Sequence, residues 1–99
     1  MKKIYEGKYC IVRGDRSGVF AGEVEEREGQ NVIIRNCRRL WYWAGACSIS
    51  ELAVNGTARP NDCKFTVTVD EIELTDVIEI IPCTKEAEES IKDVGIWRY

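Results

Sequence analysis

The sequence contains no histidine, only two prolines and one methionine, and no apolar run near the ~20 residues of a membrane-spanning helix. Histidine is the most common general base in enzymes, so its absence leaves acid–base catalysis to carboxylates, lysine or tyrosine. Glycine-rich phosphate loops, nucleophile elbows and catalytic triads are also missing. We therefore expect a protein that is not an enzyme, needs no cofactor and does not enter a membrane.

The five cysteines are odd in number and widely spaced, and no two of them form a C-x-x-C pair. Without histidine or such a pair the common zinc sites cannot be built, so we expect no metal site. The start of the chain, MKKIYEGKY, has two lysines but no apolar segment after them, and we expect no signal peptide. An intracellular setting predicts reduced, half-buried thiols; a redox or catalytic role for one of them is the alternative.

Charged residues, in contrast, are abundant. They make up 31% of the 99 residues beside 44% hydrophobic residues, which is typical of one globular domain over residues 1–99. The net charge is −3, with +3 on residues 1–48 and −6 on residues 49–99. An acidic total disfavours general DNA binding, which needs a broad basic face. The opposite charges suit self-association, or packing of the two halves within one chain.

Hydrophobic periodicity predicts five strands, at residues 8–14, 19–28, 32–43, 63–69 and 77–81. The segment 29–31 (GQN) carries the residues of a hairpin turn, so the first three strands form an antiparallel meander. Gly22, inside the second strand, indicates a bulge or a close backbone approach. In the segment 63–69, Phe65 and the two valines alternate with polar residues and would share one face.

Two helices are predicted by their capping residues. Over 48–56, Ser48 and Glu51 form a capping box and Gly56 is placed to end the helix. Over 84–94, Thr84 is the expected N-cap, and acidic residues follow in the first turns, where the helix dipole favours them. The predicted class is α+β: an antiparallel β-meander, in part an SH3-like barrel, with a short central helix and a C-terminal helix.

An arginine–aromatic block, RNCRRLWYW, ends the third predicted strand. Strict alternation places one set of its side chains on a single face: Arg35, Cys37, Arg39, Trp41 and Trp43. Arginine is a planar fork for phosphate, and tryptophan is a platform on which a base can stack. The sequence therefore suggests a site for a nucleotide-like anion, with ligand-binding residues Arg35, Arg38, Arg39, Trp41 and Trp43.

Structural roles for the same block compete with this interpretation. Tryptophan dominates the cores and subunit interfaces of small domains, and arginine stacked on an indole can be purely structural. The segment AGA that follows would leave free N–H groups for an anion, or Ser48 would simply cap the helix. The acidic stretch 70–76 offers oxygen ligands for a divalent cation, but a solvated strand face explains it better.

Two longer segments, VIIRNCRRLWYWAGACSISELAVNGTARPNDCKF and ELTDVIEIIPCTKEAEESI, together with the closing tryptophan, resemble a family of small uncharacterised proteins of tailed bacteriophages and prophages. The likeness covers roughly residues 32–97, and its most specific part is RRLWYWAGA. It implies a phage or prophage origin and a setting in the host cytoplasm. It implies no known activity, so no functional residue is carried over from it.

Together these features predict a non-catalytic, phage-encoded binding protein that acts in the host cell. Counter-defence is one such role, by sequestering a nucleotide-like ligand or by inhibiting a host protein. The alternative is a structural or assembly protein whose aromatic block mediates self-association, and a homo-oligomer is expected in either case. A third hypothesis is an inhibitor whose acidic face mimics nucleic acid, built from Glu71, Glu73, Asp76 and Glu79.

Overall fold

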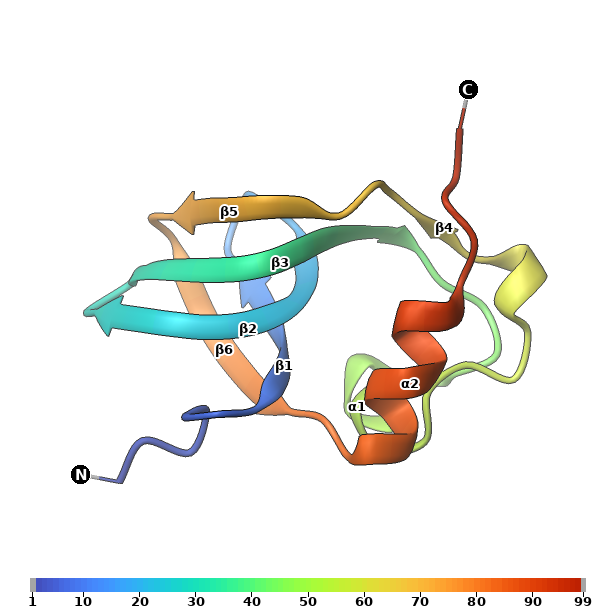
Figure 1. Ribbon diagram of the computed structural model, residues 1–99, viewed down its shortest axis with the longest axis horizontal. Helices are drawn as coiled ribbons and strands as arrows, with labels where there is room; N and C mark the ends of the chain where they lie inside the picture. The colour runs from blue at the N-terminus through green and yellow to red at the C-terminus, as the bar shows by residue number, and fades with distance from the viewer. Residues whose placement is uncertain (1, 99) are drawn as a thin grey trace.

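The computed structural model describes residues 2–98 and shows one antiparallel sheet with two helices (Figure 1). The strands are β1 (Tyr9–Gly14), β2 (Val19–Glu28), β3 (Asn31–Tyr42), β4 (Lys64–Phe65), β5 (Val69–Leu74) and β6 (Val77–Pro82). The helices are α1 (Ile49–Asn55), α2 (Lys85–Asp93) and the short 3-10 helix η1 (Pro60–Asp62). The predicted α+β class and the predicted meander are confirmed.

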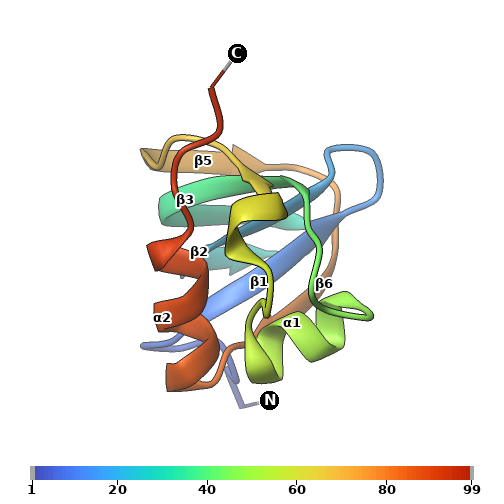
Figure 2. The same cartoon turned by 90° about the vertical axis from the view of Figure 1, so that its right-hand side faces the viewer.

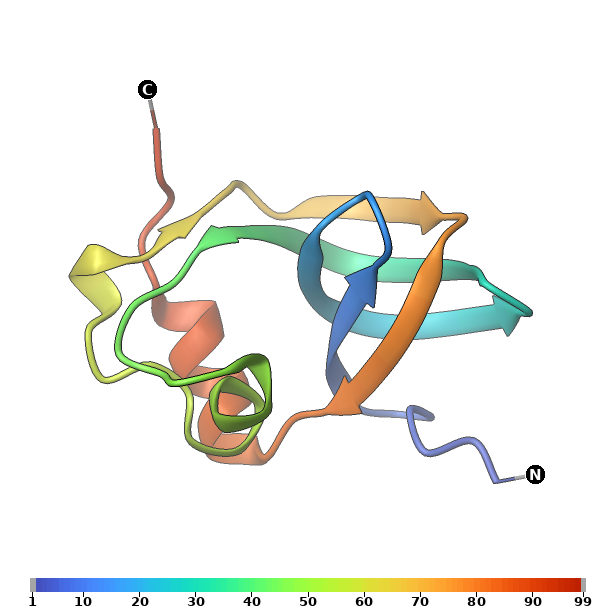
Figure 3. The same ribbon diagram turned by 180° about the vertical axis from the view of Figure 1, so that it is seen from behind.

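The strand order is β4-β3-β2-β1-β6, and β5 pairs with β3 beside β4. In this order β5 and β6 lie at opposite edges of the sheet, although they follow one another in the chain. The sheet curls so that a tight turn can join these two edges (Figure 3). Asp76 in that turn accepts hydrogen bonds from the main-chain N–H groups of Arg16 and Ser17, at 2.7 and 2.9 Å. These bonds tie the β1–β2 turn to the β5–β6 turn and close one end of the partial barrel.

Both faces of the curled sheet are covered, so the protein has two cores. The barrel core lies inside the curl and draws only on strands: Cys10, Val12, Phe20, Val24, Val32, Ile34, Cys37, Leu74 and Val77. The helix-side core lies beneath α1 and α2 on the opposite face: Tyr9, Ile11, Ala21, Leu40, Leu52, Ala53, Cys63, Phe65, Ile91 and Val94. Figure 2 shows the two helices side by side against that face. Burial of apolar side chains on both faces is the main source of stability.

The helix boundaries agree with the capping residues. Ser48 accepts a hydrogen bond from the N–H of Glu51 at 3.3 Å, and Thr84 accepts one from Ala87 at 3.0 Å. One detail of the predicted capping box is wrong, because the Glu51 carboxylate accepts from the N–H of Cys47 instead of that of Ser48. Within residues 2–98 no helix is long and apolar enough to cross a membrane.

The prediction of one regular strand over 63–69 is also wrong. Only Lys64 and Phe65 form β4, and Val67 is 55% exposed instead of sharing the buried face of Phe65. The chain leaves the sheet here and returns as β5 at Val69. The predicted loop at 57–62 contains the 3-10 turn η1, which begins at Pro60.

Candidate binding surface

A β-bulge in β3 decides where the arginine–aromatic block points. Ala21 of β2 pairs with Arg38 and Glu23 pairs with Arg35, so β3 carries one extra residue between these two pairs. Asn36 occupies the bulge with φ 50°, a left-handed conformation that asparagine tolerates. Ile34 and Cys37 therefore both face the barrel core, and strict alternation fails.

The consequence is that the predicted single face does not exist. Arg35 precedes the bulge and lies on the side opposite Ile34, whereas Arg39 follows the bulge and lies on the side of Cys37. Arg38 points toward the helices with Leu40. Arg35 and Arg38 therefore lie on one side of the sheet and Arg39 on the other, so the three arginines do not form the single phosphate site that the sequence suggested.

Arg38 is buried, with 4% of its surface exposed, and its guanidinium binds main-chain carbonyls. Nη1 donates to Ile91 and Val94 at the end of α2, at 3.0 and 2.8 Å, and Nε donates to Thr66 at 2.9 Å. Nη2 donates to Phe65 at 3.2 Å and, more weakly, to Gly95 at 3.5 Å. With these donors engaged, Arg38 fastens α2 to the sheet and has no free fork for a ligand phosphate.

The charge of Arg38 is compensated by dipoles instead of a carboxylate. The carbonyls at the end of α2 carry the negative end of the helix dipole, which favours a cation there. Burial lowers the pKa of Arg38, and the nearby Tyr9 opposes that shift. Burial likewise raises the pKa of Tyr9, which therefore stays neutral.

The other two arginines are exposed and engaged separately. Arg35 forms an ion pair with Glu25 at 3.3 Å, and that hydrogen bond raises the pKa of Arg35. Arg39 lies over the ring of Phe20 at 4.4 Å and donates from Nη1 to the carbonyl oxygen of Ser17 at 2.9 Å. Of the two, only Arg39 carries no carboxylate partner among residues 2–98, so only it keeps an uncompensated charge.

The exposed aromatic residues gather where the C-terminal segment crosses the end of β3. The indoles of Trp41 and Trp97 are stacked, with centroids 5.1 Å apart and an interplanar angle of 12°. Trp41 is 58% exposed and Trp97 37%. The Lys64 ammonium lies 5.1 Å from the ring of Trp41, 5.6 Å from Trp97 and 5.8 Å from Tyr42. We call Trp41, Tyr42, Lys64 and Trp97 the aromatic surface.

The segment that brings Trp97 to this surface is anchored to β4. Ile96 forms a parallel bridge with Phe65, and the N–H of Trp97 donates to the Phe65 carbonyl at 2.8 Å. Figure 1 shows the C-terminal segment passing β4. A hollow of about 250 Å³ lies beside Trp97 and is also lined by Pro60, Asn61 and Arg98. The side-chain amide of Asn61 and the guanidinium of Arg98 therefore lie in a hollow next to the stacked indoles.

Trp43 does not belong to the aromatic surface. It is half-buried and packs against the helix-side core, as the structural alternative for the block predicted. Trp97 and Lys64, in contrast, were not among the predicted site residues. The signal available in the sequence was the aromatic tail IWRY, which had to dock somewhere or fray, but no pattern indicated its partner.

The cysteine thiols and the side chains that could bind a metal form no further candidate site in the described residues. Burial raises the pKa of Cys10 to about 11 and that of Cys37 to about 12, so both thiols are protonated at neutral pH. No cysteine in the described part of the chain is in a disulfide. Among residues 2–98 no three His, Cys, Asp or Glu side chains are grouped to hold a metal ion.

Residues 7–91 match the domain of unknown function DUF6948. The chain belongs to this family. Comparison with curated proteins found no match, and neither did comparison with solved structures. The DUF6948 match includes Arg38, Trp41 and Lys64 but ends before Trp97, so half of the indole stack lies outside the matched residues. Membership of an uncharacterised family agrees with the resemblance drawn from the sequence.

Proposed function

We propose that this protein is a non-catalytic binding domain that holds a nucleotide-like anion on its aromatic surface. The observation that carries the proposal is the stacked pair Trp41–Trp97, which stays substantially exposed beneath a lysine ammonium. Large indoles are normally buried, so two adjacent exposed ones point to a partner. A base stacked on such a platform contributes about 1–3 kcal/mol.

The charges around the aromatic surface suit a phosphate. Lys64 brings its ammonium over the rings, and Arg98 lines the hollow beside Trp97. Arg39 lies two residues before Trp41 on β3 and stays in the proposal as a third cation, although its guanidinium lies over Phe20. In this proposal Lys64 and Arg98 replace Arg35, which is paired with Glu25, and Arg38, which is buried. Trp43 supports the surface from the core and does not contact the ligand.

The setting we propose is the cytoplasm of a phage-infected host. Its support is the resemblance of residues 32–97 to small tailed-phage and prophage proteins, together with the absence of a catalytic set of residues in the sequence. Sequestering a nucleotide signal of host defence is a role that needs binding without catalysis, and inhibition of a host protein is the related alternative.

A second candidate function is self-association through the same surface in a structural or assembly protein. It is favoured by the exposed area of the surface, since its member Tyr42 and the adjacent Ile96 are both about half exposed. Aromatic residues are enriched at the centres of protein interfaces. A homo-oligomer built this way would bury the indoles against a partner chain.

The test is thermal melting of the pure protein with mono-, di- and cyclic nucleotides and short oligonucleotides, followed by tryptophan fluorescence. A ligand at 100 times its Kd adds about 2.7 kcal/mol, which for a domain of this size raises the Tm by roughly 10–20 °C. Trp41→Ala and Lys64→Gln should abolish the shift. Lys85→Gln, an exposed lysine at the start of α2, is the control and should retain it.

Light scattering separates the two candidates. A monomer with a nucleotide-dependent shift supports ligand binding. An oligomer that Trp41→Ala dissociates, with no shift for any nucleotide, supports self-association. A monomer that no nucleotide stabilises contradicts both.

A further inference from the structure

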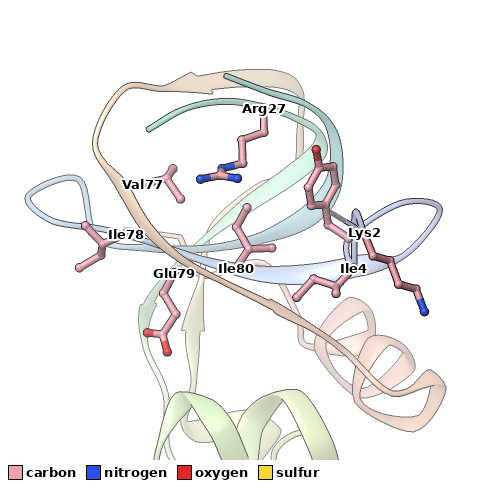
Figure 4. Close-up of a pocket in the computed structure, with 8 residues that line it drawn as sticks. Lys2, Ile4, Arg27, Val77, Ile78, Glu79 and Ile80 are labelled. Atoms are coloured by element: carbon pink, nitrogen blue, oxygen red, sulfur yellow. The ribbon is translucent and has the colours of Figure 1, made fainter. Parts of the chain in front are cut away.

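A second cavity lies away from the aromatic surface, between the N-terminal segment, the end of β2 and β6 (Figure 4). Its volume is about 240 Å³. The apolar residues that line it are Ile4, Tyr5, Val77, Ile78 and Ile80. Ile4 and Ile78 are each about half exposed. The cavity therefore presents an apolar wall to solvent.

The wall borders the unpaired edge of the sheet. In the part of the chain that the structure describes, β6 pairs only with β1. The N–H of Cys83 donates to the carbonyl of Tyr9, so this pair is hydrogen-bonded. Along an antiparallel pair every second residue is bonded to the partner strand, which makes Ile81 the next bonded residue of β6. Ile80 lies between bonded residues, and its N–H therefore points away from β1. The N–H of Ile80 thus borders the cavity as a hydrogen-bond donor that is not bonded to a neighbouring strand.

Arg27 supplies the charge of the cavity. Figure 4 shows its guanidinium reaching from β2 toward Val77 and Ile80, whereas Glu79 extends away from it. The Nε of Arg27 donates to the Gly29 carbonyl at 3.0 Å, which holds the side chain in place. Among residues 2–98 no carboxylate lies within ion-pair distance of Arg27, and Glu79 is paired with Arg13 at 3.4 Å. Lys2 adds a second cation at the rim.

We propose that this cavity is a binding site for a small amphipathic carboxylate, with an acyl or aryl body on the isoleucine wall and its head on Arg27. An arginine fork matches a carboxylate bidentately, and the N–H of Ile80 offers a further donor to the same head. A volume of 240 Å³ holds about eight waters, which limits the ligand to on the order of ten non-hydrogen atoms. This site is independent of the nucleotide proposal, because the two share no residue.

The experiment is a titration of the 15N-labelled protein with octanoate, followed by amide chemical shifts, with 1-octanol as the uncharged comparison. For a ligand of this size we expect saturable shifts at Ile4, Ile78 and Ile80 and a Kd on the order of 0.1–1 mM. Octanol should bind at least about tenfold more weakly, because its hydroxyl carries no charge and cannot form a bidentate pair with the guanidinium.

Arg27→Gln should raise the Kd for octanoate about tenfold and leave that for octanol unchanged, and Arg27→Lys should restore part of the affinity. Arg16→Gln, an exposed arginine on the β1–β2 turn, is the matched control and should bind as the wild type does. The spectrum of each variant reports whether it is folded. Absence of saturable shifts, equal binding of octanol, or unchanged binding in a folded Arg27→Gln protein would overturn the proposal, as would shifts confined to the aromatic surface.

Discussion

Replacing Arg38 by methionine tests the central feature of the helix-side core. Methionine keeps the unbranched apolar stem of arginine as far as the position of Nε, and it removes every donor. The carbonyls of Thr66, Ile91 and Val94 then lose bonds of 2.9, 3.0 and 2.8 Å. Part of this loss is offset, because a buried cation no longer has to be desolvated. Each buried carbonyl left without a donor costs about 1–3 kcal/mol, so with this offset we expect Arg38→Met to destabilise the protein by about 3–5 kcal/mol.

Guanidinium denaturation measures the effect. A loss of this size is a large share of the roughly 5–15 kcal/mol that holds a domain folded, and it should lower the unfolding midpoint by about 1–2 M. Arg38→Lys should lie between the wild type and Arg38→Met, because lysine keeps the charge without the fork. Arg35→Met, which removes an exposed ion pair, should leave the midpoint nearly unchanged. A loss below about 1 kcal/mol in Arg38→Met would refute the reasoning.

Three further predictions concern the sheet and the helix caps. Gly22→Ala should destabilise the protein by about 2–4 kcal/mol in the same assay, because its Cβ would lie 2.6 Å from Ile34 Cγ2 and 2.8 Å from the Arg35 carbonyl oxygen, both at the β3 bulge. Hydrogen bonds, first of all that from the Arg16 N–H, lower the pKa of Asp76 in the folded protein. The ionised carboxylate therefore stabilises the fold fully above its unfolded pKa near 4, and this contribution is lost as the pH falls through the folded pKa. Denaturation curves of Asp76→Asn should lack this decline in stability at acid pH. Thr84→Ala should cost about 1 kcal/mol in thermal melts and should fray the start of α2 in amide exchange, where an unchanged protection pattern would contradict the cap.

The parts of the fold that the sequence predicted well are those set by local chemistry. Ser48 and Thr84 mark helix starts because a hydroxyl that caps a helix acts within three residues of itself. The turn at Gly29 and the close approach at Gly22 were also visible, because Gly29 has φ 61°, which glycine adopts without strain, and Gly22 has no room for a Cβ.

The candidate site was harder, because its geometry depends on contacts between distant segments. Alternation along β3 predicted one face, but the bulge at Asn36 reverses the alternation, and bulges leave little trace in the sequence of the bulged strand. Arg38 was predicted as a phosphate-binding residue, with a structural role as the alternative, and only the end of α2, more than fifty residues later, explains why it is buried. Trp97 reaches Trp41 through a bridge between Ile96 and Phe65 that no periodicity encodes.

The two cores leave β1 with an unusual problem of register. Its residues alternate between Tyr9 and Ile11, which face the helices, and Cys10 and Val12, which face the barrel. In a strand with one wet face, a slip of one residue is penalised because apolar side chains enter water. Here a slip would exchange one dry environment for another at Tyr9 to Val12, whereas Arg13, which is exposed and paired with Glu79, would be turned from water toward the barrel core. The register of β1 must therefore be read from side-chain size, with the larger pair beneath the helices, and from the fit of Gly14 against Asp76 at the strand's end. If β1 folded in the wrong register, its apolar side chains would be badly packed but still buried. Such a misfolded protein would expose no additional apolar residue of β1 for a chaperone to recognise.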